Sequence, residues 1–413
     1  MTVIQFQKPI KGIDQLSDET SLIEGTVRDA QNILIDRDGN FERRPGYTLR
    51  VPGSGYHSSY SSKRGWLLIC QKNVINILDP ETFSLTPIVS MNDSSLTSFT
   101  EYNDNLYFVN RGSSGMFRTN EAVVRDIGLS LPSISPSFAA SSNGTLHPGT
   151  YGITYTIVDE FGEESGTGPI QTVELPNGGG IIGSMFAIVS DHKWRIYMTT
   201  ADGEELYQAD EFTANVATYI IDDHRQERQA ETLHLKPLPY GLTIRSHGAR
   251  LYVADKNHIS YSSAFRPHLY NPATHFIPII GYPYMMESIE AGIYVSDNTG
   301  VRFYQGKEPA EFVIVDSSPE RAIFGTSAVI PGHFMSEDFN IYDRVVVWLS
   351  RLGYQVGLPT GEVVSLHKDQ VKLPNYVQGC STAFTYEGKR QLVTPVQSNE
   401  SSGTNIAIDS SIM

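Results

Sequence analysis

Basic residues are scarce in this sequence. Lys and Arg together number 31 against 46 Asp and Glu, so the formal net charge is −15 at pH 7. A protein that binds nucleic acid tightly needs a basic surface that offsets the phosphates, and this balance disfavours that class. An acidic surface suits a passage through which DNA slides without sticking, because it repels the phosphate backbone. Plain solubility would explain the same charge.

Cysteines and long apolar runs are also nearly absent. The two cysteines, Cys70 and Cys380, lie far apart and have no CxxC or metal-type neighbour. We predict two reduced thiols in a chain made in a cytosol. No run of 18 apolar residues occurs, so no membrane-spanning helix is expected. The first residues, MTVIQFQKPIKG, lack a charged region followed by an apolar one, so no signal peptide is expected.

Helical periodicity is the third feature that is missing. The best helical candidate, residues 19–32, is interrupted by Gly25, and we predict loop and short strand there. The 22 Tyr, 18 Phe, 35 Gly and 22 Pro favour many short strands and turns over long helices. A chain of 413 residues exceeds one compact core, so two or three units are expected.

Short aromatic or β-branched runs, paired across turn residues, recur along the chain. They recur every 40 to 55 residues or so, which is the range expected for the blades of a β-propeller. About five or six such units can be found, with no WD dipeptide. The predicted strands are RGWLLIC (64–70), VINILD (74–79), NDNLYFVN (103–110), HGARLYVAD (247–255), HISYSS (258–263), EAGIYVSD (290–297), VRFYQG (301–306), DRVVVWLS (343–350), TGEVVSL (360–366) and EGKRQLVTPV (387–396).

The middle of the chain differs from this pattern. A Pro/Ser-rich stretch, residues 129–143, predicts a linker. In residues 147–168, Tyr151, Ile153, Tyr155 and Ile157 alternate with small or polar residues, which predicts a strand with one buried face. Three further strands are predicted at 193–200, 205–212 and 217–222. We therefore predict an all-β chain: an irregular β-propeller body with an inserted immunoglobulin/fibronectin-like β-sandwich.

The predicted boundaries follow from these changes of pattern. Residues 1–142 would form an N-terminal arm and the first blades, and residues 143–236 the inserted sandwich. Residues 237–413 would form the remaining blades and a C-terminal tail, with PLPYG (237–241) marking the return to the body.

Several of these segments, in this order, resemble a family of tailed-bacteriophage virion proteins, the tail nozzle, tail tubular or packaged-DNA stabilisation proteins of the head–tail connector. The resemblance touches most of the chain from Asn32 to about Val396. Its segments are NILIDRDGNFERRPGY (32–47), PGTYGITYTIVDEFGEES (148–165) with RIYMTT (195–200), HGARLYVADKNHISYSSAFRPHLYNP (247–272), GIYVSDNTGVRFYQGKEP (292–309) and VVVWLSRLGYQVGLPTGEVVSL (345–366).

The resemblance implies a structural subunit with no catalytic residues to carry over. Such a subunit forms a homo-oligomeric ring below the portal, encloses the DNA passage, and retains packaged DNA until ejection. Its implied partners are portal, adaptor and other tail proteins, with DNA passing through without specific binding. The expected location is the tail or neck of the virion, after assembly in the host cytoplasm. The alternatives are a receptor- or carbohydrate-binding propeller of the tail, and a glycosidase on a propeller scaffold, for which no distinctive carboxylate pair is found.

No motif supports an enzyme, a cofactor or a metal site. Asp36-x-Asp38-Gly39 resembles the start of a calcium loop, but Tyr47 stands where the loop needs Glu, so a turn is predicted. Glu163-Glu164 predicts a solvated turn, and Gly178–Gly180 a flexible one. Six histidines between His224 and His275 are too widely spaced for a metal site, and the partial GxSxG at 53–55 lacks its strand–elbow–helix setting.

A ring needs exposed contact patches, since head-to-tail subunits join two different surfaces. Arg43 and Arg44 predict a rigid turn, with a contact to a neighbouring subunit or to DNA as the alternative. The aromatic residues of three turn-rich segments are predicted either to contact neighbouring subunits or to be core residues under loops. These residues are Tyr56, Tyr60, Phe265, Tyr270, Tyr282 and Tyr284.

Overall fold

The structure is an all-β protein. It is a computed structural model that describes residues 13–18, 20–22, 24–30, 32–35, 40–44, 46, 48–119, 121–132, 135–184, 192–213, 218–223, 227–335, 343–366, 373, 375–386, 388–398 and 406–411. Strands make up 52% of it, and its described part contains no α-helix, which confirms the all-β prediction. Two short 3-10 turns, η1 (Pro309–Glu311) and η2 (Gly332–Phe334), are the helical elements in these ranges. No helix in these ranges is long and apolar enough to cross a membrane.

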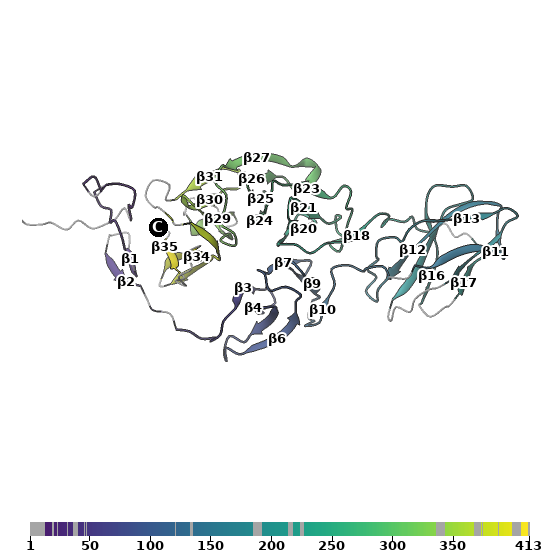
Figure 1. The fold of residues 1–413 in the computed structure, drawn as a ribbon, viewed down its shortest axis with the longest axis horizontal. Helices are drawn as coiled ribbons and strands as arrows, with labels where there is room; N and C mark the ends of the chain where they lie inside the picture. Colours follow the sequence, from purple (N-terminus) through teal and green to yellow (C-terminus); the bar gives the residue numbers. More distant parts are fainter. Residues whose placement is uncertain are drawn as a thin grey trace, which may run out of the picture.

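Six antiparallel four-stranded sheets form most of the chain and follow one another along an arc (Figure 1). Their strands are β3 (Tyr56–Ser61), β4 (Leu67–Gln71), β5 (Val74–Leu78) and β6 (Leu85–Ser90); β7 (Ser98–Tyr102), β8 (Asn105–Val109), β9 (Ser114–Phe117) and β10 (Val124–Arg125); β19 (Thr243–His247), β20 (Arg250–Asp255), β21 (His258–Tyr261) and β23 (Phe276–Pro278); β24 (Met285–Ile289), β25 (Gly292–Asp297), β26 (Gly300–Gln305) and β27 (Val313–Ser318); β28 (Ala328–Pro331), β29 (Arg344–Ser350), β30 (Gly353–Gly357) and β31 (Val363–Ser365); and β32 (Tyr376–Gly379), β33 (Thr382–Tyr386), β34 (Lys389–Ser398) and β35 (Ile406–Ser411).

The recurrence seen in the sequence corresponds to these sheets. Every run predicted as a strand overlaps an observed strand, and the runs 247–255 and 258–263 correspond to β20 and β21, which pair with each other. The first strands of the sheets begin at residues 56, 98, 243, 285, 328 and 376. Successive starts are therefore 42 to 48 residues apart, except between 98 and 243, where the inserted segment lies.

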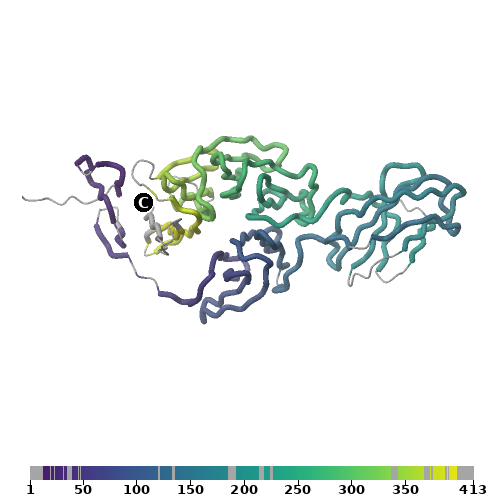
Figure 2. Tube along the Cα trace, viewed as in Figure 1, coloured from purple at the N-terminus to yellow at the C-terminus, as the bar shows by residue number. Residues whose placement is uncertain are grey.

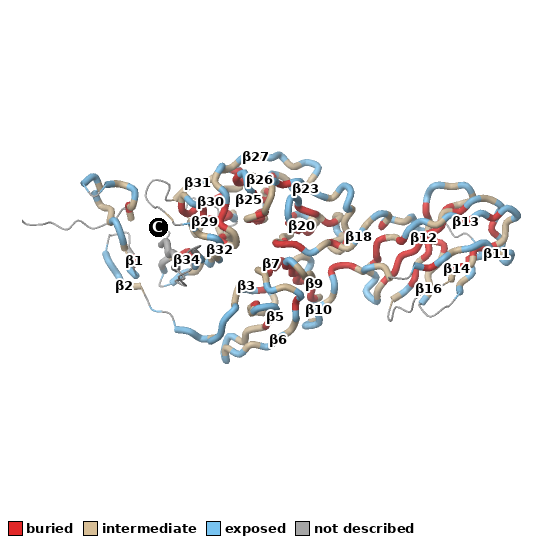
Figure 3. The backbone as a smooth tube through the Cα atoms, in the orientation of Figure 1, coloured by how far each residue is buried: buried red, intermediate tan, exposed pale blue. Residues whose placement is uncertain are grey.

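Consecutive sheets pack face to face, and alternation along each strand divides its side chains between two neighbours. On β8, Leu106 and Phe108 join a buried cluster with the β3–β6 sheet. The intervening Tyr107 and Val109 join a second cluster with the β19–β23 sheet. Because both faces are covered, such strands are apolar throughout and not alternating, which is why they stand out in the sequence. Figure 3 shows the buried residues gathered between the sheets.

The inserted segment, which we term the module, contains two further sheets packed on one core. The three-stranded sheet has the order β11-β14-β17 and the four-stranded sheet the order β13-β12-β15-β16. Trp194, Tyr155 and Ile196 lie at the centre of the core between them. The strands are β11 (Ser137–Leu146), β12 (Gly149–Val158), β13 (Gln171–Leu175), β14 (Gly179–Ser184), β15 (Lys193–Met198), β16 (Tyr207–Thr213) and β17 (Thr218–Ile221).

Two sequence predictions for this region were wrong. The expected linker, residues 129–143, ends in strand β11, which pairs with β14, so the paired part of the module already begins at Ser137. The glycine run was predicted to be a flexible turn, but Gly179 and Gly180 start β14. A Cβ on Gly180 would lie 2.1 Å from the carbonyl oxygen of Asn143. The run is therefore needed for close backbone approach and not for flexibility.

Before the first sheet lies a small hairpin of β1 (Ile33–Ile35) and β2 (Phe41–Arg43). The Asp36–Gly39 turn predicted there lies outside the described residues. The expected absence of helix around Gly25 agrees with turns and a single bridge between Ile13 and Val27. The hairpin lies at one end of the molecule and the module at the other (Figure 1).

Candidate functional site: the junction between the sheet stack and the module

The chain leaves the sheet stack after β10 and returns at β18 (Lys236–Pro237), and the two connections run side by side (Figure 2). The amide of Thr167 donates to the carbonyl oxygen of Thr232 (3.3 Å), and the amide of Leu238 to that of His268 (3.1 Å). β18 pairs with β22 (Leu269–Tyr270), which ties the return to the third sheet. The module is thus joined to the stack by a double connection and not by one flexible tether.

A cluster of charged residues around Phe161 joins the module to the sheet stack. The guanidinium carbon of Arg118 lies 3.8 Å from the centroid of the Phe161 ring and that of Arg125 4.5 Å from it. Arg118 also pairs with Glu163 (2.8 Å), and Arg125 with Glu160 (3.3 Å). Both arginines belong to the second sheet, whereas the aromatic ring and the carboxylates belong to the module. We term this group the clasp. Desolvation raises the pKa of Glu163 although Arg118 opposes the shift.

The turn that carries Phe161 is fixed by its first residue. Asp159 Oδ1 accepts hydrogen bonds from the amides of Phe161 (2.9 Å) and Glu163 (2.8 Å). Gly162 has a φ of +82°, which favours glycine. The turn places the aromatic ring of Phe161 and the carboxylate of Glu163 beside the two arginines.

The prediction of a solvated turn is wrong for Glu164, the residue that follows Glu163. Only 7% of its side chain is exposed. Its carboxylate accepts hydrogen bonds from Thr156 Oγ1 (2.8 Å), Tyr197 OH (2.7 Å) and Arg195 Nη1 (2.7 Å). Arg195 also donates to Glu211 (2.7 Å). These hydrogen-bond donors stabilise the buried negative charge of Glu164. Two of its partners, Arg195 and Tyr197, lie about 30 residues further along the chain, so no local pattern in the sequence indicates them.

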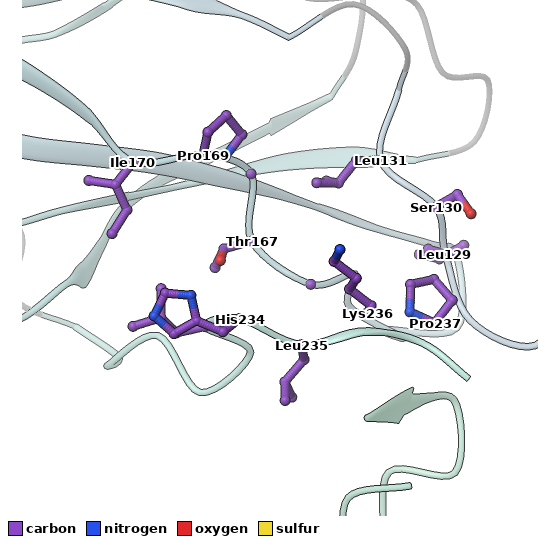
Figure 4. A pocket seen from close by; sticks show the side chains of 13 residues that line it. Leu129, Ser130, Leu131, Thr167, Pro169, Ile170, His234, Leu235, Lys236 and Pro237 are labelled. Carbon is purple, nitrogen blue, oxygen red and sulfur yellow. The ribbon is translucent and has the colours of Figure 1, made fainter. Parts of the chain in front are cut away.

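An apolar cavity of about 600 Å³ lies beside the two connections. Figure 4 shows Leu131, Ile170 and Leu235 around it, with the Lys236 amino group and the Thr167 hydroxyl also at its wall. His234, another lining residue, has a φ of +62°, which is unusual for a residue other than glycine. The cavity could hold an apolar group.

A second polar group joins the first strands of four successive sheets. Arg245 on β19 donates through Nε and Nη2 to both oxygens of Glu287 on β24, each at 2.7 Å. Its Nη1 donates to Ser98 Oγ on β7 (2.7 Å), and Ser327 Oγ, next to β28, donates to Glu287 (2.7 Å). We term the Arg245–Glu287 ion pair the inner-strand pair. Its partners are satisfied within the chain, so it stabilises the stack.

The predicted contact residues have different surroundings. Phe265 is 80% exposed, and Arg43 is exposed on β2. The amide of Arg44 donates to the carbonyl oxygen of Asn32 (2.9 Å), which continues the β1–β2 pairing, so Arg43 lies in strand β2, Arg44 directly follows it, and the predicted turn is wrong.

The predicted tyrosines have contacts inside the chain. Tyr56 OH donates to the carbonyl oxygen of Pro52 (3.2 Å), and Tyr60 stacks on Phe99. Tyr282 accepts from Arg111 (3.0 Å) and Tyr284 from Arg321 (2.7 Å). Tyr270 is half-buried on β22. Desolvation raises the pKa of Tyr60 to about 12.

The histidines of the predicted loose cluster serve separate parts of the structure. His247 contacts Ser288 Oγ (3.1 Å) and the carbonyl oxygen of Gly306 (2.7 Å), and His275 stacks on Tyr261. His268 lies at the junction, and His224 lies outside the described residues. Across the ranges given above, no three His, Cys, Asp or Glu side chains are grouped as metal ligands.

His268 predicts a pH dependence of stability. Burial, with Arg266 adding to the effect, lowers its pKa to about 4, whereas an unfolded histidine has a pKa near 6.5. Between these values the unfolded chain binds more protons, so stability falls as the pH falls. We expect the free energy of unfolding to fall by about 3 kcal/mol from pH 7 to pH 4 through this group. Urea unfolding of the wild type and His268→Gln at both pH values measures it, and equal losses in the two proteins would contradict it.

Comparisons with known proteins give no family. No protein-family model and no curated protein matches the chain. Among solved structures, it resembles the CNH domain of AfRom2 (TM-score 0.27, 8% identity, 78% of this chain and 83% of that one). A chain in a crystal structure of the mitotic checkpoint complex has TM-score 0.29 and 7% identity, with 88% and 93% covered. The extracellular domain of a two-component system from B. thetaiotaomicron has TM-score 0.22 and 9% identity, with 87% and 57% covered. No functional statement follows from likenesses this weak.

Proposed function

We propose that the six sheets form an irregular, open β-propeller and that the module is an immunoglobulin/fibronectin-like β-sandwich. Three facts support this assignment. Each body sheet is antiparallel and has neighbouring strands in sequence order, apart from the last. Each pair of neighbouring sheets packs on a core of its own. The sheets also begin at intervals in the sequence that are typical of propeller blades. The module has two antiparallel sheets packed on a core with a central tryptophan.

We propose further that the chain is a structural subunit of a tailed-phage virion. It would form a ring at the head–tail junction or the tail nozzle, contact portal, adaptor and other tail proteins, and enclose the DNA passage without catalysing a reaction. The observation that carries this proposal is the clasp. Two arginines of the stack contact an aromatic ring of the module and pair with its carboxylates, which fixes the module relative to the stack. A fixed orientation of the module allows every subunit of a closed ring to make the same head-to-tail contact.

A reconstruction of the virion tests the proposal directly. We expect copies of this chain arranged around the tail axis, between the portal and the tip, with the module in one orientation in every copy. Isolated copies on the capsid surface or at a fibre tip, with no ring, would refute it.

The net charge of −15 predicts weak DNA binding by the purified protein. The lumen of such a ring must let DNA slide, and an acidic surface releases few counterions when it meets a phosphate backbone. At about 150 mM salt we expect no duplex affinity tighter than about 1 μM, measured by fluorescence anisotropy. A tighter, salt-sensitive affinity would show that a basic patch dominates the surface.

A second candidate function, glycan or receptor binding by the propeller, is favoured by one feature. A cavity of about 360 Å³ is lined by Tyr284, Phe324 and Tyr376 together with Arg321 and Arg351. Aromatic faces and guanidinium donors are groups that bind sugars and carboxylated sugars. Binding of host surface glycans to the wild type, abolished by Arg351→Ala, would favour this function over ring formation.

A further inference from the structure

We propose that the smaller cavity, together with Tyr282 outside it, binds an acidic polysaccharide in which a carboxylated sugar is followed by a neutral one. The cavity of about 360 Å³ holds the carboxylated ring, and Tyr282 packs on the neutral ring that follows. This inference deepens the second candidate function, glycan binding, and rests on it. It does not depend on ring formation by the subunits.

The lining of this cavity has the opposite charge to the molecule as a whole. It includes two arginines, Arg321 and Arg351, and no Asp or Glu, whereas the chain carries a net charge of −15. Arg351 lies in the turn after β29, is exposed, and has no ion pair or hydrogen bond within the described part of the chain. Glu320 precedes Arg321 in the sequence but is not a lining residue. The cavity can therefore bind an anion without displacing a carboxylate of the protein.

Arg321 is held in position by a tyrosine. Its guanidinium carbon lies 4.5 Å from the centroid of the Tyr284 ring, and its Nη1 donates to Tyr284 OH (2.7 Å). Among the described residues, Nε and Nη2 of Arg321 have no hydrogen-bond partner. These two nitrogens form the edge of a guanidinium that donates two parallel hydrogen bonds to a carboxylate. The same edge of Arg245 binds Glu287 in the inner-strand pair. Arg321 is thus oriented for a carboxylate before a ligand arrives.

Aromatic and amide side chains make the rest of the cavity suitable for a sugar ring. Phe324 and Tyr376 line it and are half-buried, and the exposed Asn375 lies beside Tyr376. The C–H groups of a sugar ring pack on aromatic side chains, and its hydroxyls hydrogen-bond to polar groups such as an amide. The volume is at the lower end of the range of small-ligand sites, about 300–1,000 Å³. A single ring therefore matches the cavity better than a longer segment does.

Tyr282 extends the aromatic surface beyond the cavity. The centroid of its ring lies 5.6 Å from that of Phe324, and the two rings pack edge to face. Arg111 donates to Tyr282 OH (3.0 Å), which fixes the ring from its other side. Asp93 and Asp255 lie close enough to Arg111 to raise its pKa, and they offset its charge. Tyr282 therefore offers a surface for packing without a second anion site, which suits a neutral sugar.

The charge of the molecule favours this ligand over a nucleic acid. A nucleic acid carries a phosphate on every nucleotide, and a surface with few basic residues offsets little of that charge. In the proposed polysaccharide, neutral rings separate the carboxylates, so one pair of arginines can neutralise the bound segment. Single-stranded DNA also combines negative charge with rings that stack on aromatic side chains, so it is included in the test.

Binding of the full chain to an array of tetrasaccharides tests the proposal. In each one an acidic sugar alternates with a neutral one, and glucuronic, galacturonic, mannuronic and sialic acids are all represented. Each has a matched tetrasaccharide whose carboxylates are reduced to alcohols, and an oligothymidylate is included. We expect at least one acidic tetrasaccharide to bind with a Kd of about 1 mM or tighter in titration calorimetry, and its reduced form to bind at least about tenfold more weakly.

Three variants assign this binding to the cavity. Arg351→Gln should weaken it at least about tenfold, because a charge-assisted hydrogen bond is lost. The matched control is Arg344→Gln, since Arg344 is also exposed but is the first residue of β29, at the opposite end of the strand from Arg351. It should keep the affinity of the wild type. Tyr282→Leu preserves an apolar side chain, and should weaken binding of the tetrasaccharide but not of the acidic monosaccharide. Urea unfolding confirms that each variant is folded.

The outcomes separate the site from the function. If no acidic tetrasaccharide binds at millimolar concentration, the site and the glycan-binding function are both wrong. If one binds and Arg351→Gln and Tyr282→Leu retain full affinity, the site is wrong and the glycan-binding function requires another. Equal binding of the reduced tetrasaccharide, or tighter binding of the oligothymidylate, would also overturn the proposal. The ring is decided separately, by the reconstruction of the virion.

Discussion

Glu287→Ala is expected to lower the free energy of unfolding of the sheet stack by about 3–5 kcal/mol. The Glu287 side chain is 5% exposed and accepts both hydrogen bonds of a bidentate pair with Arg245, as well as one from Ser327. Removing it leaves a guanidinium at the inner strands of four sheets without its counter-charge. The loss is that of an uncompensated charge, which exceeds the value of the pair itself.

The matched control is Glu308→Ala. Glu308 also pairs with an arginine of the third sheet, Arg250, at 3.0 Å, but its side chain is 41% exposed. An exposed pair contributes at most about 1 kcal/mol, so this variant should unfold close to the wild type. Urea unfolding followed by tryptophan fluorescence measures both. Equal losses in the two variants would show that burial of the inner-strand pair has no special effect.

A double replacement separates the charge from the packing. In Arg245→Met/Glu287→Leu no unpaired charge remains, and the loss should be smaller than in Glu287→Ala alone. If the double variant is less stable than the single one, the pair is worth more than apolar side chains at this position.

The sequence predicted those strands that are buried on both faces. On β29, Val346 and Trp348 face one core while Val345 and Val347 face the next, so the whole strand is apolar. Such runs next to a Gly-containing turn are recognisable without knowing what covers them. The strand pairs β20–β21 and β25–β26, and strand β29, were therefore found.

The first strands of the third and fourth sheets, β19 and β24, were not found, because the charged side chains that they carry are explained only by other sheets. Thr243–His247 includes Arg245, and Met285–Ile289 includes Glu287. Taken alone, each of these residues predicts a solvated charged side chain, because its partner lies about 40 residues away in the sequence. Strand β11 was missed for a related reason, since its mostly exposed Ser and Ala side chains give no signal and its pairing with β14 defines it.

In the candidate site, too, the sequence predicts the local features and not those that depend on distant segments. The turn at residues 159–163 could be predicted from Asp and Gly, because its hydrogen bonds are local. The clasp and the Glu164 network could not be predicted in this way. The clasp joins the second sheet to the module, and the Glu164 network joins strands of one sheet, β12, β15 and β16, that lie far apart in the sequence. Arg118 and Phe161 are 43 positions apart in the sequence, and nothing in either segment indicates the other.

Glu164→Ala should lower the stability of the module by about 3–5 kcal/mol and leave the sheet stack nearly unchanged. The buried carboxylate is the common acceptor for Thr156, Arg195 and Tyr197, so its removal leaves three donors without that partner. The module's buried cluster contains residues from 146 to 221 and none from the six sheets, so the module can unfold as its own cooperative unit.

Calorimetry can resolve this difference, because two units with separate cores unfold in separate transitions. For a domain of about this size, 3 kcal/mol corresponds to a shift of more than about 10 °C in Tm. We expect that shift in the transition of the module for Glu164→Ala, and a shift of about 6–12 °C in the transition of the larger sheet stack for Glu287→Ala. The matched control, Glu174→Ala, removes an exposed carboxylate from β13 of the same sheet and should change neither transition by more than about 0.5 kcal/mol. If Glu164→Ala moved both transitions together, the clasp would couple the module and the stack into one unit, and the ring subunit would unfold as a single body.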